Sequence, residues 1–312
     1  MAIEQLRVAN FIIGGTEKAG TTSVFMYLGD HPQVCGSSSK ETDFFRQESS
    51  GDAEIDRQNY AKYFTHCHAS TPVVMEASPG YLGEAATVIP RIASLLTDVK
   101  LLFILRDPIE RLYSSYNFHV GKLNISEDIQ FKDYVEKCLA YDSKQATPVD
   151  LGLDEWYLKV LRFGCYSDFL VPYFNAFPRN QIKVMFFEQL CDDVPGFMCE
   201  LSEFLEIDAR FWENYEFRKA NVTFSGGNKL FHRVAIYINS KAETFLRRRP
   251  KIKRFIVDCY KKLNQAREGY DPMPDFVRNE LNNYYHPSNI ALSNLLGKEL
   301  PQSWYAHVQA AE

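Results

Sequence analysis

The segment that most constrains the fold is a glycine-rich loop between an apolar run and a helical pattern. Val8 to Ile13 form the apolar run, Val24 to Leu28 begin the helical pattern, and between them lies Gly14-Gly15-Thr16-Glu17-Lys18-Ala19-Gly20-Thr21-Thr22. This order predicts a strand, a tight turn and a helix N-terminus. Because a helix N-terminus presents unbonded N–H groups and the positive end of the helix dipole, we expect the loop to bind an anion.

The loop departs from the Walker A pattern G-x-x-x-x-G-K-[ST]. Gly15 and Gly20 have the required spacing, but Thr21 stands where lysine is required, and Lys18 lies inside the loop. A Walker lysine reaches the β- and γ-phosphates, and the following Ser or Thr holds magnesium. From its earlier position Lys18 would contact a group attached to a 5′-phosphate, which Thr21 and Thr22 can also bind. A P-loop kinase or NTPase and a glycine-rich turn without ligand are the alternatives.

A second segment strengthens this interpretation. Lys100-Leu101-Leu102-Phe103-Ile104-Leu105-Arg106-Asp107-Pro108 is followed by Arg111 and by Tyr113-Ser114-Ser115-Tyr116. With the loop, this segment resembles the nucleotide motifs of the sulfotransferases that use 3′-phosphoadenosine 5′-phosphosulfate (PAPS). The resemblance implies that Arg106 and Ser114 bind the 3′-phosphate, that Tyr166 lies near the nucleotide, and that Lys229 belongs to a basic loop over it. It assigns the 5′-phosphosulfate to Gly15, Thr16, Lys18, Ala19, Gly20, Thr21 and Thr22.

The acceptor side has its own motif. Lys40-Glu41-Thr42-Asp43-Phe44-Phe45 resembles the Lys-Glu-x-x-Phe-Phe pattern of the heparan-sulfate-like sulfotransferases. The resemblance implies that Glu41 is the general base, and sulfuryl transfer does need a group that removes the acceptor proton. A solvated loop carboxylate paired with Lys40 is the alternative for Glu41.

Glu76-Ala77-Ser78-Pro79-Gly80-Tyr81 resembles the family's Glu-x-[ST]-Pro-x-Tyr segment. The resemblance implies that Glu76 and Ser78, with Asp43, lie on the acceptor side; a buried structural role is the alternative for Glu76. Heparan-type enzymes often carry Lys at the position of Ala77, and some carry His at that of Asp43. A small secondary metabolite is therefore an alternative to a carbohydrate acceptor.

The implied reaction moves a sulfuryl group from PAPS to a hydroxyl or amine and releases adenosine 3′,5′-bisphosphate, with Lys18 stabilising the developing charge. A non-catalytic nucleotide-binding module is a further alternative. No metal is implied: His66-Cys67-His68 are adjacent, so their side chains diverge, and no second ligand pair lies nearby at zinc-site spacing.

Composition narrows the class of protein. The net charge of −5 argues against general nucleic-acid binding. No apolar run approaches the roughly 18 residues of a membrane span, and no signal-peptide pattern opens the chain. The seven cysteines are odd in number and show no paired spacing, which predicts a reducing compartment and a cytoplasmic protein. Nothing in the sequence indicates the oligomeric state.

The apolar run Lys100–Leu105 indicates a strand covered on both faces, hence a parallel sheet between helices. Arg106 follows at the carboxyl end of that strand, where open α/β sheets bind ligands. Trp156 to Phe177 show helical periodicity. We therefore expect an α/β, P-loop-like single domain over 1–312, with a central parallel sheet of about five strands flanked by helices. Within it we expect a cofactor-binding core (8–120), substrate-side insertions or loops (121–153 and 207–250) and closing helices (251–312).

Overall fold

The computed structural model describes residues 6–218, 224–225, 267–268 and 272–305. The chain divides into two compact units that are interleaved in sequence. The first unit comprises 1–112, 160–220 and 278–312, and the second comprises 113–159 and 221–277. The predicted segment boundaries at 120, 153, 207 and 250 remain predictions.

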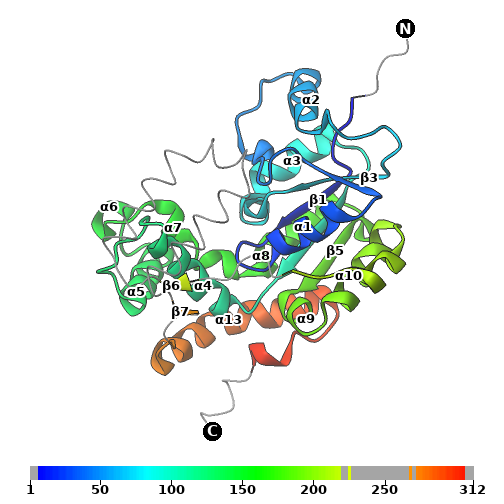
Figure 1. Cartoon of the computed structure of the whole chain (residues 1–312). Helices are drawn as coiled ribbons and strands as arrows, with labels where there is room; N and C mark the ends of the chain where they lie inside the picture. Colours follow the sequence, from blue (N-terminus) through cyan, green and yellow to red (C-terminus); the bar gives the residue numbers. More distant parts are fainter. Residues whose placement is uncertain (1–5, 219–223, 226–266, 269–271, 306–312) are drawn as a thin grey trace. The chain divides into compact units, whose positions relative to one another are not determined.

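The first unit contains a five-stranded parallel sheet (Figure 1). Its strand order is β2-β3-β1-β4-β5, and every pair in it is parallel. The strands are β1 (Phe11–Gly15), β2 (Val34–Gly36), β3 (Val73–Ala77), β4 (Lys100–Leu105) and β5 (Ile182–Phe186). The predicted α/β fold with a central parallel sheet between helices is confirmed.

Side chains alternate between the two faces of the sheet, as the period of a strand requires. Phe11 and Ile13 of β1 belong to one buried cluster, whereas Ile12 between them belongs to the other. Helices α1 (Thr21–Asp30) and α10 (Val194–Leu205) supply the first cluster. Helices α3 (Ala85–Leu95) and α8 (Tyr166–Ala176) supply the second. Both faces are thus covered, which explains the unbroken apolar run of β4.

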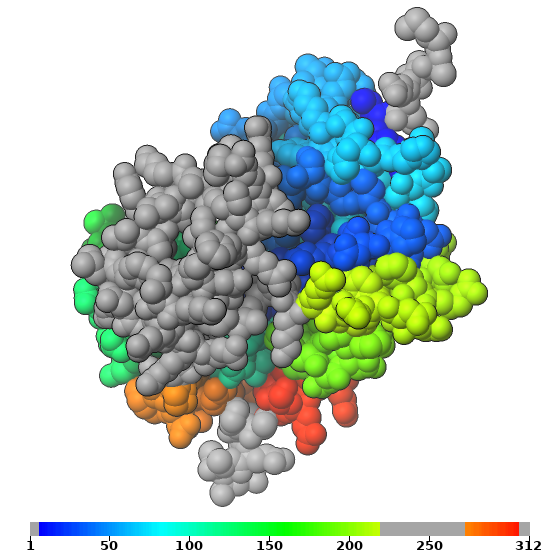
Figure 2. All heavy atoms as spheres, viewed as in Figure 1, coloured from blue at the N-terminus to red at the C-terminus, as the bar shows by residue number. Residues whose placement is uncertain are grey.

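The segment after α10 packs on α1. Tyr27 of α1 lies edge-on to Tyr215 and to Phe217, with ring centroids 6.0 and 5.1 Å apart. In Figure 2 the yellow-green atoms of this segment lie directly beside the blue atoms of α1. The helix that follows the glycine-rich loop is therefore held on both sides, by the sheet and by this aromatic group.

The remaining elements of the first unit are short. They are α2 (Ala53–Ala61), α9 (Phe187–Asp192) and the 3-10 helices η1 (Phe44–Arg46), η2 (Lys62–Phe64), η3 (Pro79–Glu84), η4 (Arg162–Gly164), η5 (Arg179–Gln181), η6 (Ala209–Asn214) and η7 (Gln302–Trp304). Two longer helices, α4 (Pro108–Gly121) and α13 (Asp275–Leu296), each contain a boundary between the units.

The second unit is mainly helical where it is described. It contains α5 (Phe131–Asp142), α6 (Pro148–Leu151), α7 (Glu155–Lys159) and the antiparallel pair β6 (Phe224–Ser225) and β7 (Arg267–Glu268). Tyr116 packs against Phe131 and Tyr134, with ring centroids 5.2 and 5.3 Å away. Across both units, none of the helices within the described ranges is long and apolar enough to cross a membrane.

Parallel pairing brings the carboxyl ends of the strands to one edge of the sheet. The Ser78 N–H donates to the Ile13 carbonyl (3.1 Å), and the Thr16 N–H donates to the Ile104 carbonyl (2.9 Å). The loop that follows β3 is therefore bonded to β1, and the loop that follows β1 is bonded to β4. Ligands of open α/β sheets bind at this edge.

Candidate active site

The loop after β1 has the geometry of an anion cradle. Gly20 is the N-cap of α1, with φ 79°, and it has no side chain to bond the first N–H groups of the helix. Those groups lack intrahelical partners, so they remain donors for a ligand. Lys18 also has a left-handed backbone, with φ 67°. That conformation costs a residue with a Cβ atom roughly 1–2 kcal/mol, so neighbouring contacts must hold it.

Close packing explains the glycines of the loop. A Cβ atom on Gly15 would lie 2.8 Å from the Leu82 Cβ, and one on Gly20 would lie 2.7 Å from the Leu190 Cδ2. Both distances are shorter than van der Waals contact. The glycines therefore bring the loop backbone against η3 on one side and against α9 on the other.

Arg106 holds the loop from the end of β4. Its Nη1 donates to the Lys18 carbonyl (3.0 Å), and its Cζ lies 4.8 Å from the centroid of the Phe187 ring. Tyr166 is fully buried and donates its hydroxyl to the Arg106 carbonyl (2.7 Å). The Arg106 guanidinium is stacked on a ring, and the Arg106 backbone is held by Tyr166, so the side chain has little rotational freedom. Arg106 is thus a preorganised cation beside the loop.

The carboxyl groups of Asp107 and Glu188 accept hydrogen bonds from the backbone that follows Arg106. Burial raises the pKa of Asp107 to about 6, although its carboxylate also accepts from the Ile109 N–H (2.8 Å). Glu188 Oε1 accepts from the Asp107 N–H and from Trp304 Nε1, each at 2.9 Å. These bonds fix the turn from β4 into α4, and therefore the direction in which Arg106 leaves the sheet.

Most of the other residues predicted to bind the nucleotide are buried. Thr16, Ala19 and Thr21 are buried, and Thr22 is half-buried at the start of α1. Ser114 is buried on α4 and belongs to the second unit, so its pairing with Arg106 remains a prediction. Lys229 lies outside the described residues.

Glu41 lies in the connection after β2, with its side chain 54% exposed and its carboxylate paired with the Lys40 ammonium. This pairing is the one expected of a solvated loop carboxylate, so the role of base remains a proposal. The loop backbone is nevertheless fixed, because the Glu41 N–H donates to the Ala77 carbonyl (2.9 Å). Asp43 is half-buried and accepts from Arg46 Nη1 (3.3 Å).

Glu76 and Ser78, predicted on the acceptor side, are both 0% exposed. Ser78 Oγ donates to Glu76 Oε1 (2.7 Å) and accepts from the Asp43 N–H (3.1 Å). Burial raises the pKa of Glu76, and the hydrogen bonds that the carboxylate accepts act in the opposite direction. Both side chains therefore lie beneath the loop that carries Glu41.

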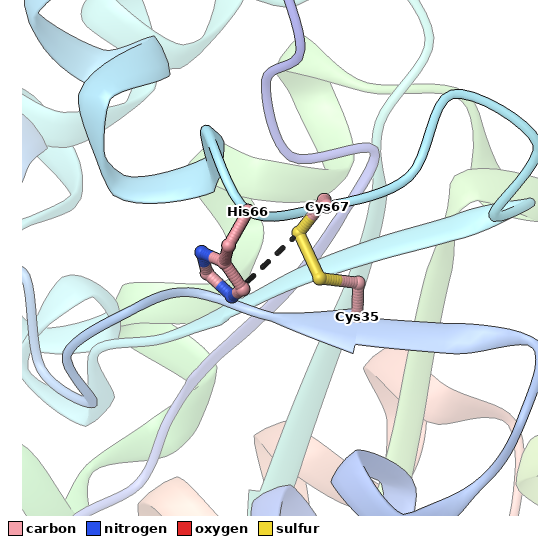
Figure 3. Close-up of side chains that lie close together, drawn as sticks. All are labelled: Cys35, His66 and Cys67. Carbon is pink, nitrogen blue, oxygen red and sulfur yellow. Dashed lines mark hydrogen bonds between the residues drawn. A yellow bond between two sulfur atoms is a disulfide. The ribbon is translucent and has the colours of Figure 1, made fainter.

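Cys35 and Cys67 form a disulfide (Figure 3), with a separation of 32 in the sequence and Cα atoms 5.8 Å apart. This pairing corrects the expectation from cysteine spacing, because the packing of β2 against the segment after η2 unites two distant cysteines. It also removes the cysteine-based argument for a reducing compartment. His66 Nε2 lies 3.9 Å from the Cys67 Sγ, completing a group of potential metal ligands. In the disulfide neither sulfur is a thiolate, the form that binds metals.

Sequence reasoning missed several residues of this edge. Phe187 beneath Arg106 and Glu188 behind it come from the segment after β5, which contains no recognisable motif. Tyr60, Thr42 and Tyr81 each donate a hydroxyl to Glu76, although Tyr60 comes from α2. Thr42 and Tyr81 lie within the two acceptor-side motifs at 40–45 and 76–81, whereas no motif in the sequence included Tyr60.

Comparisons with known proteins find several sulfotransferases among the similar sequences. The human bifunctional heparan sulfate N-deacetylase/N-sulfotransferase 3 is 26% identical over 309 residues, covering 96% of this chain and 31% of that protein. The membrane-associated sulfotransferase kil1 of Dictyostelium discoideum is 33% identical over 147 residues, covering 43% of this chain and 30% of its own. The mouse heparan sulfate glucosamine 3-O-sulfotransferase 3B1 is 26% identical over 196 residues, covering 62% of this chain and 45% of its own. The chain thus spans less than half the length of these relatives.

A crystal structure of a sulfotransferase from Alicyclobacillus acidocaldarius has the same fold, with a TM-score of 0.64 and 20% identity, covering 96% of this chain and 99% of that one. The family model described as the sulfotransferase domain matches residues 9–225, which include the loop, the β4 segment and the connection that carries Glu41. That match extends over more than half of the sequence. The chain therefore belongs to the sulfotransferase family.

Proposed function

We propose that this chain is a PAPS-dependent sulfotransferase that modifies a hydroxyl or amine of an acceptor. The observation that carries the proposal is the hydrogen bond from Arg106 to the Lys18 carbonyl, which joins two motifs separated by 88 residues. In the proposed complex these motifs bind opposite ends of one nucleotide, the 5′-phosphosulfate and the 3′-phosphate. The contact supports a single site at the carboxyl edge of the sheet.

The donors at this edge suit a polyanionic nucleotide. The N-terminus of α1 presents N–H groups, Thr21 and Thr22 offer hydroxyls, and Lys18 and Arg106 contribute cations. The Lys18 carbonyl takes one N–H of the Arg106 guanidinium, which has five in all. In the proposal Ser114 and Lys229 add to the 3′-phosphate site, and Tyr166 supports it by holding the Arg106 carbonyl.

PAPS supplies the sulfuryl group when bound. Lys18 stabilises negative charge at the 5′-phosphate end, as electrostatic catalysis requires. Glu41 accepts the proton that the acceptor hydroxyl or amine loses, after its carboxylate leaves Lys40. Asp43, two residues further along the same loop, contributes to acceptor binding. None of these roles requires a metal ion.

A carbohydrate acceptor has the broader support. The Lys-Glu-x-x-Phe-Phe pattern at 40–45 resembles that of heparan-type enzymes, and two of the similar proteins bear heparan sulfate in their names. We therefore propose a sugar hydroxyl or amine as the acceptor, with a small secondary metabolite as the alternative.

Calorimetry would test the nucleotide site. We expect adenosine 3′,5′-bisphosphate to bind more tightly than AMP or ATP, equally well with Mg²⁺ and with EDTA. Arg106→Ala should weaken bisphosphate binding about 10–100-fold, since a hydrogen bond to a charged group contributes about 1.5–3 kcal/mol. The loss for AMP, which lacks the 3′-phosphate, should be smaller. A preference for Mg·ATP would overturn the proposal in favour of a kinase or NTPase.

Two controls separate specific from general effects. Arg210 has a side chain 82% exposed and bonded to Asp208, so Arg210→Ala removes the same charge and should leave bisphosphate binding unchanged. For catalysis, Glu41→Gln should lower kcat by about 10²–10⁴ on any acceptor that is sulfated, because this is the usual contribution of a general base. Glu48→Gln, at an exposed position soon after the loop, should have no effect. Equal activity of Glu41→Gln and the parent chain would refute the assigned base.

A further inference from the structure

Glu76 is the centre of a buried group of hydroxyls. Its side chain is 0% exposed at the carboxyl end of β3. Oε1 accepts from Thr42 (2.5 Å), Tyr81 (2.6 Å) and Ser78 (2.7 Å), and Oε2 accepts from Tyr60 (2.5 Å). An ionised carboxylate only accepts hydrogen bonds, and here four hydroxyls donate to it, three to Oε1 and one to Oε2.

These bonds converge on the loop that carries Glu41. Thr42, the next residue, donates directly to Glu76. The residues around Glu76 hold the loop backbone as well: the Ala77 carbonyl accepts from the Glu41 N–H, and Ser78 Oγ accepts from the Asp43 N–H (3.1 Å). The Phe45 N–H donates to the Tyr81 hydroxyl (3.2 Å), which itself donates to Glu76.

The loop needs such support because of its backbone. Glu41 has φ 60° and Asp43 has φ 49°, and neither is glycine. Left-handed residues with a Cβ atom persist only where the surroundings over-determine them. Thr42 lies between the two, and its buried hydroxyl bonds this turn directly to Glu76 of β3. The loop conformation therefore depends on the acceptor that Glu76 provides.

We propose that Glu76 is a positioning residue for Glu41, acting through Thr42, and that it does not itself contact the acceptor. The inference rests on the proposed function, since it gives a reason for holding Glu41 in one conformation. A buried carboxylate costs solvation energy, which a hydrophobic side chain would not. A carboxylate beneath a catalytic loop, bonded to four hydroxyls from three segments, instead fixes geometry at the reacting group.

The test compares two variants that each deprive Glu76 of one hydrogen bond. Thr42→Val removes the bond to the loop, whereas Tyr60→Phe removes the bond to α2, leaving the loop attached. Hydrogen–deuterium exchange of the full chain should show at least tenfold faster exchange over residues 41–45 in Thr42→Val and little change there in Tyr60→Phe. Thr42→Ser keeps the hydroxyl and should restore slow exchange. Equal exchange in Thr42→Val and Tyr60→Phe would overturn the proposal.

Activity provides the second measurement. On an acceptor that the parent sulfates, Thr42→Val should lower kcat about 10–100-fold, because a displacement of about 1 Å can cost a factor of that size. Binding of adenosine 3′,5′-bisphosphate should stay within about threefold of the parent. Glu76→Gln should behave likewise, and Tyr60→Phe should retain most of its kcat. If Glu41→Gln is fully active, the proposed base is wrong; if only Glu41→Gln is impaired, the positioning role is wrong.

Discussion

Gly20→Ala tests how the anion loop is built. Gly20 has φ 79°, and a Cβ atom there would lie 2.7 Å from the Leu190 Cδ2 and 3.1 Å from the Phe187 Cδ2. The left-handed backbone alone costs an alanine roughly 1–2 kcal/mol. Forcing the neighbouring side chains aside adds about 1–3 kcal/mol, the usual cost of overpacking. We therefore expect the free energy of unfolding to fall by about 2–5 kcal/mol.

The chain offers a matched control. Gly51 has φ 84°, nearly the same backbone conformation, but no atom lies within 4 Å of a Cβ atom placed there. Gly51→Ala should therefore cost only the backbone part, about 1–2 kcal/mol. Any effect of alanine on the unfolded chain is common to both variants and cancels in their difference. That difference isolates the steric part at the loop.

Urea denaturation of the full-length variants, followed by tryptophan fluorescence, gives both free energies of unfolding. Gly20→Ala should also weaken the binding of adenosine 3′,5′-bisphosphate, since Phe187, which it displaces, lies beneath Arg106. If the two variants differ by less than about 0.5 kcal/mol, the packing around Gly20 is not as tight as we infer. If Gly20→Ala destabilises the chain but leaves bisphosphate binding intact, the loop is structural and does not form the anion site.

Two further predictions concern stability. The Ser49 hydroxyl and other donors hold the pKa of Asp56 at about 2, below the ordinary 3.8, so this carboxylate stabilises the fold above pH 4, and its contribution is lost as pH falls towards 2. Asp56→Asn should therefore lower the free energy of unfolding by about 1–2 kcal/mol at pH 5 and by about a third of that at pH 2.5, and a pH-independent effect in urea titrations would contradict this. The disulfide between Cys35 and Cys67 closes a 32-residue separation, so replacing both cysteines by serine should cost roughly 2–4 kcal/mol. The parent chain under reducing conditions should then match the double-serine variant, and an unchanged denaturation midpoint in both would refute a stabilising role.

The sequence by itself determined the features that depend on neighbouring residues. The apolar run, the glycines and the helical pattern predicted β1, the loop and α1, because strand, turn and helix propensities are local. The run Lys100–Leu105 predicted a strand covered on both faces, and its two faces do belong to separate buried clusters. The family motifs identified Lys18, Glu41 and Arg106 as candidates, since their chemistry is recognisable from residue type and spacing.

Only the tertiary structure decided which distant groups meet. The predicted helix from Trp156 to Phe177 is broken at Arg162–Gly164, where Tyr285 from α13 packs so closely that a Cβ atom on Gly164 would lie 2.6 Å from its ring. The disulfide and the hydroxyl cluster around Glu76 likewise join residues far apart in the sequence. Such contacts depend on the packing of whole elements, which local periodicity does not encode. For that reason the sequence identified the chemistry of the edge, while the fold determined which side chains support it.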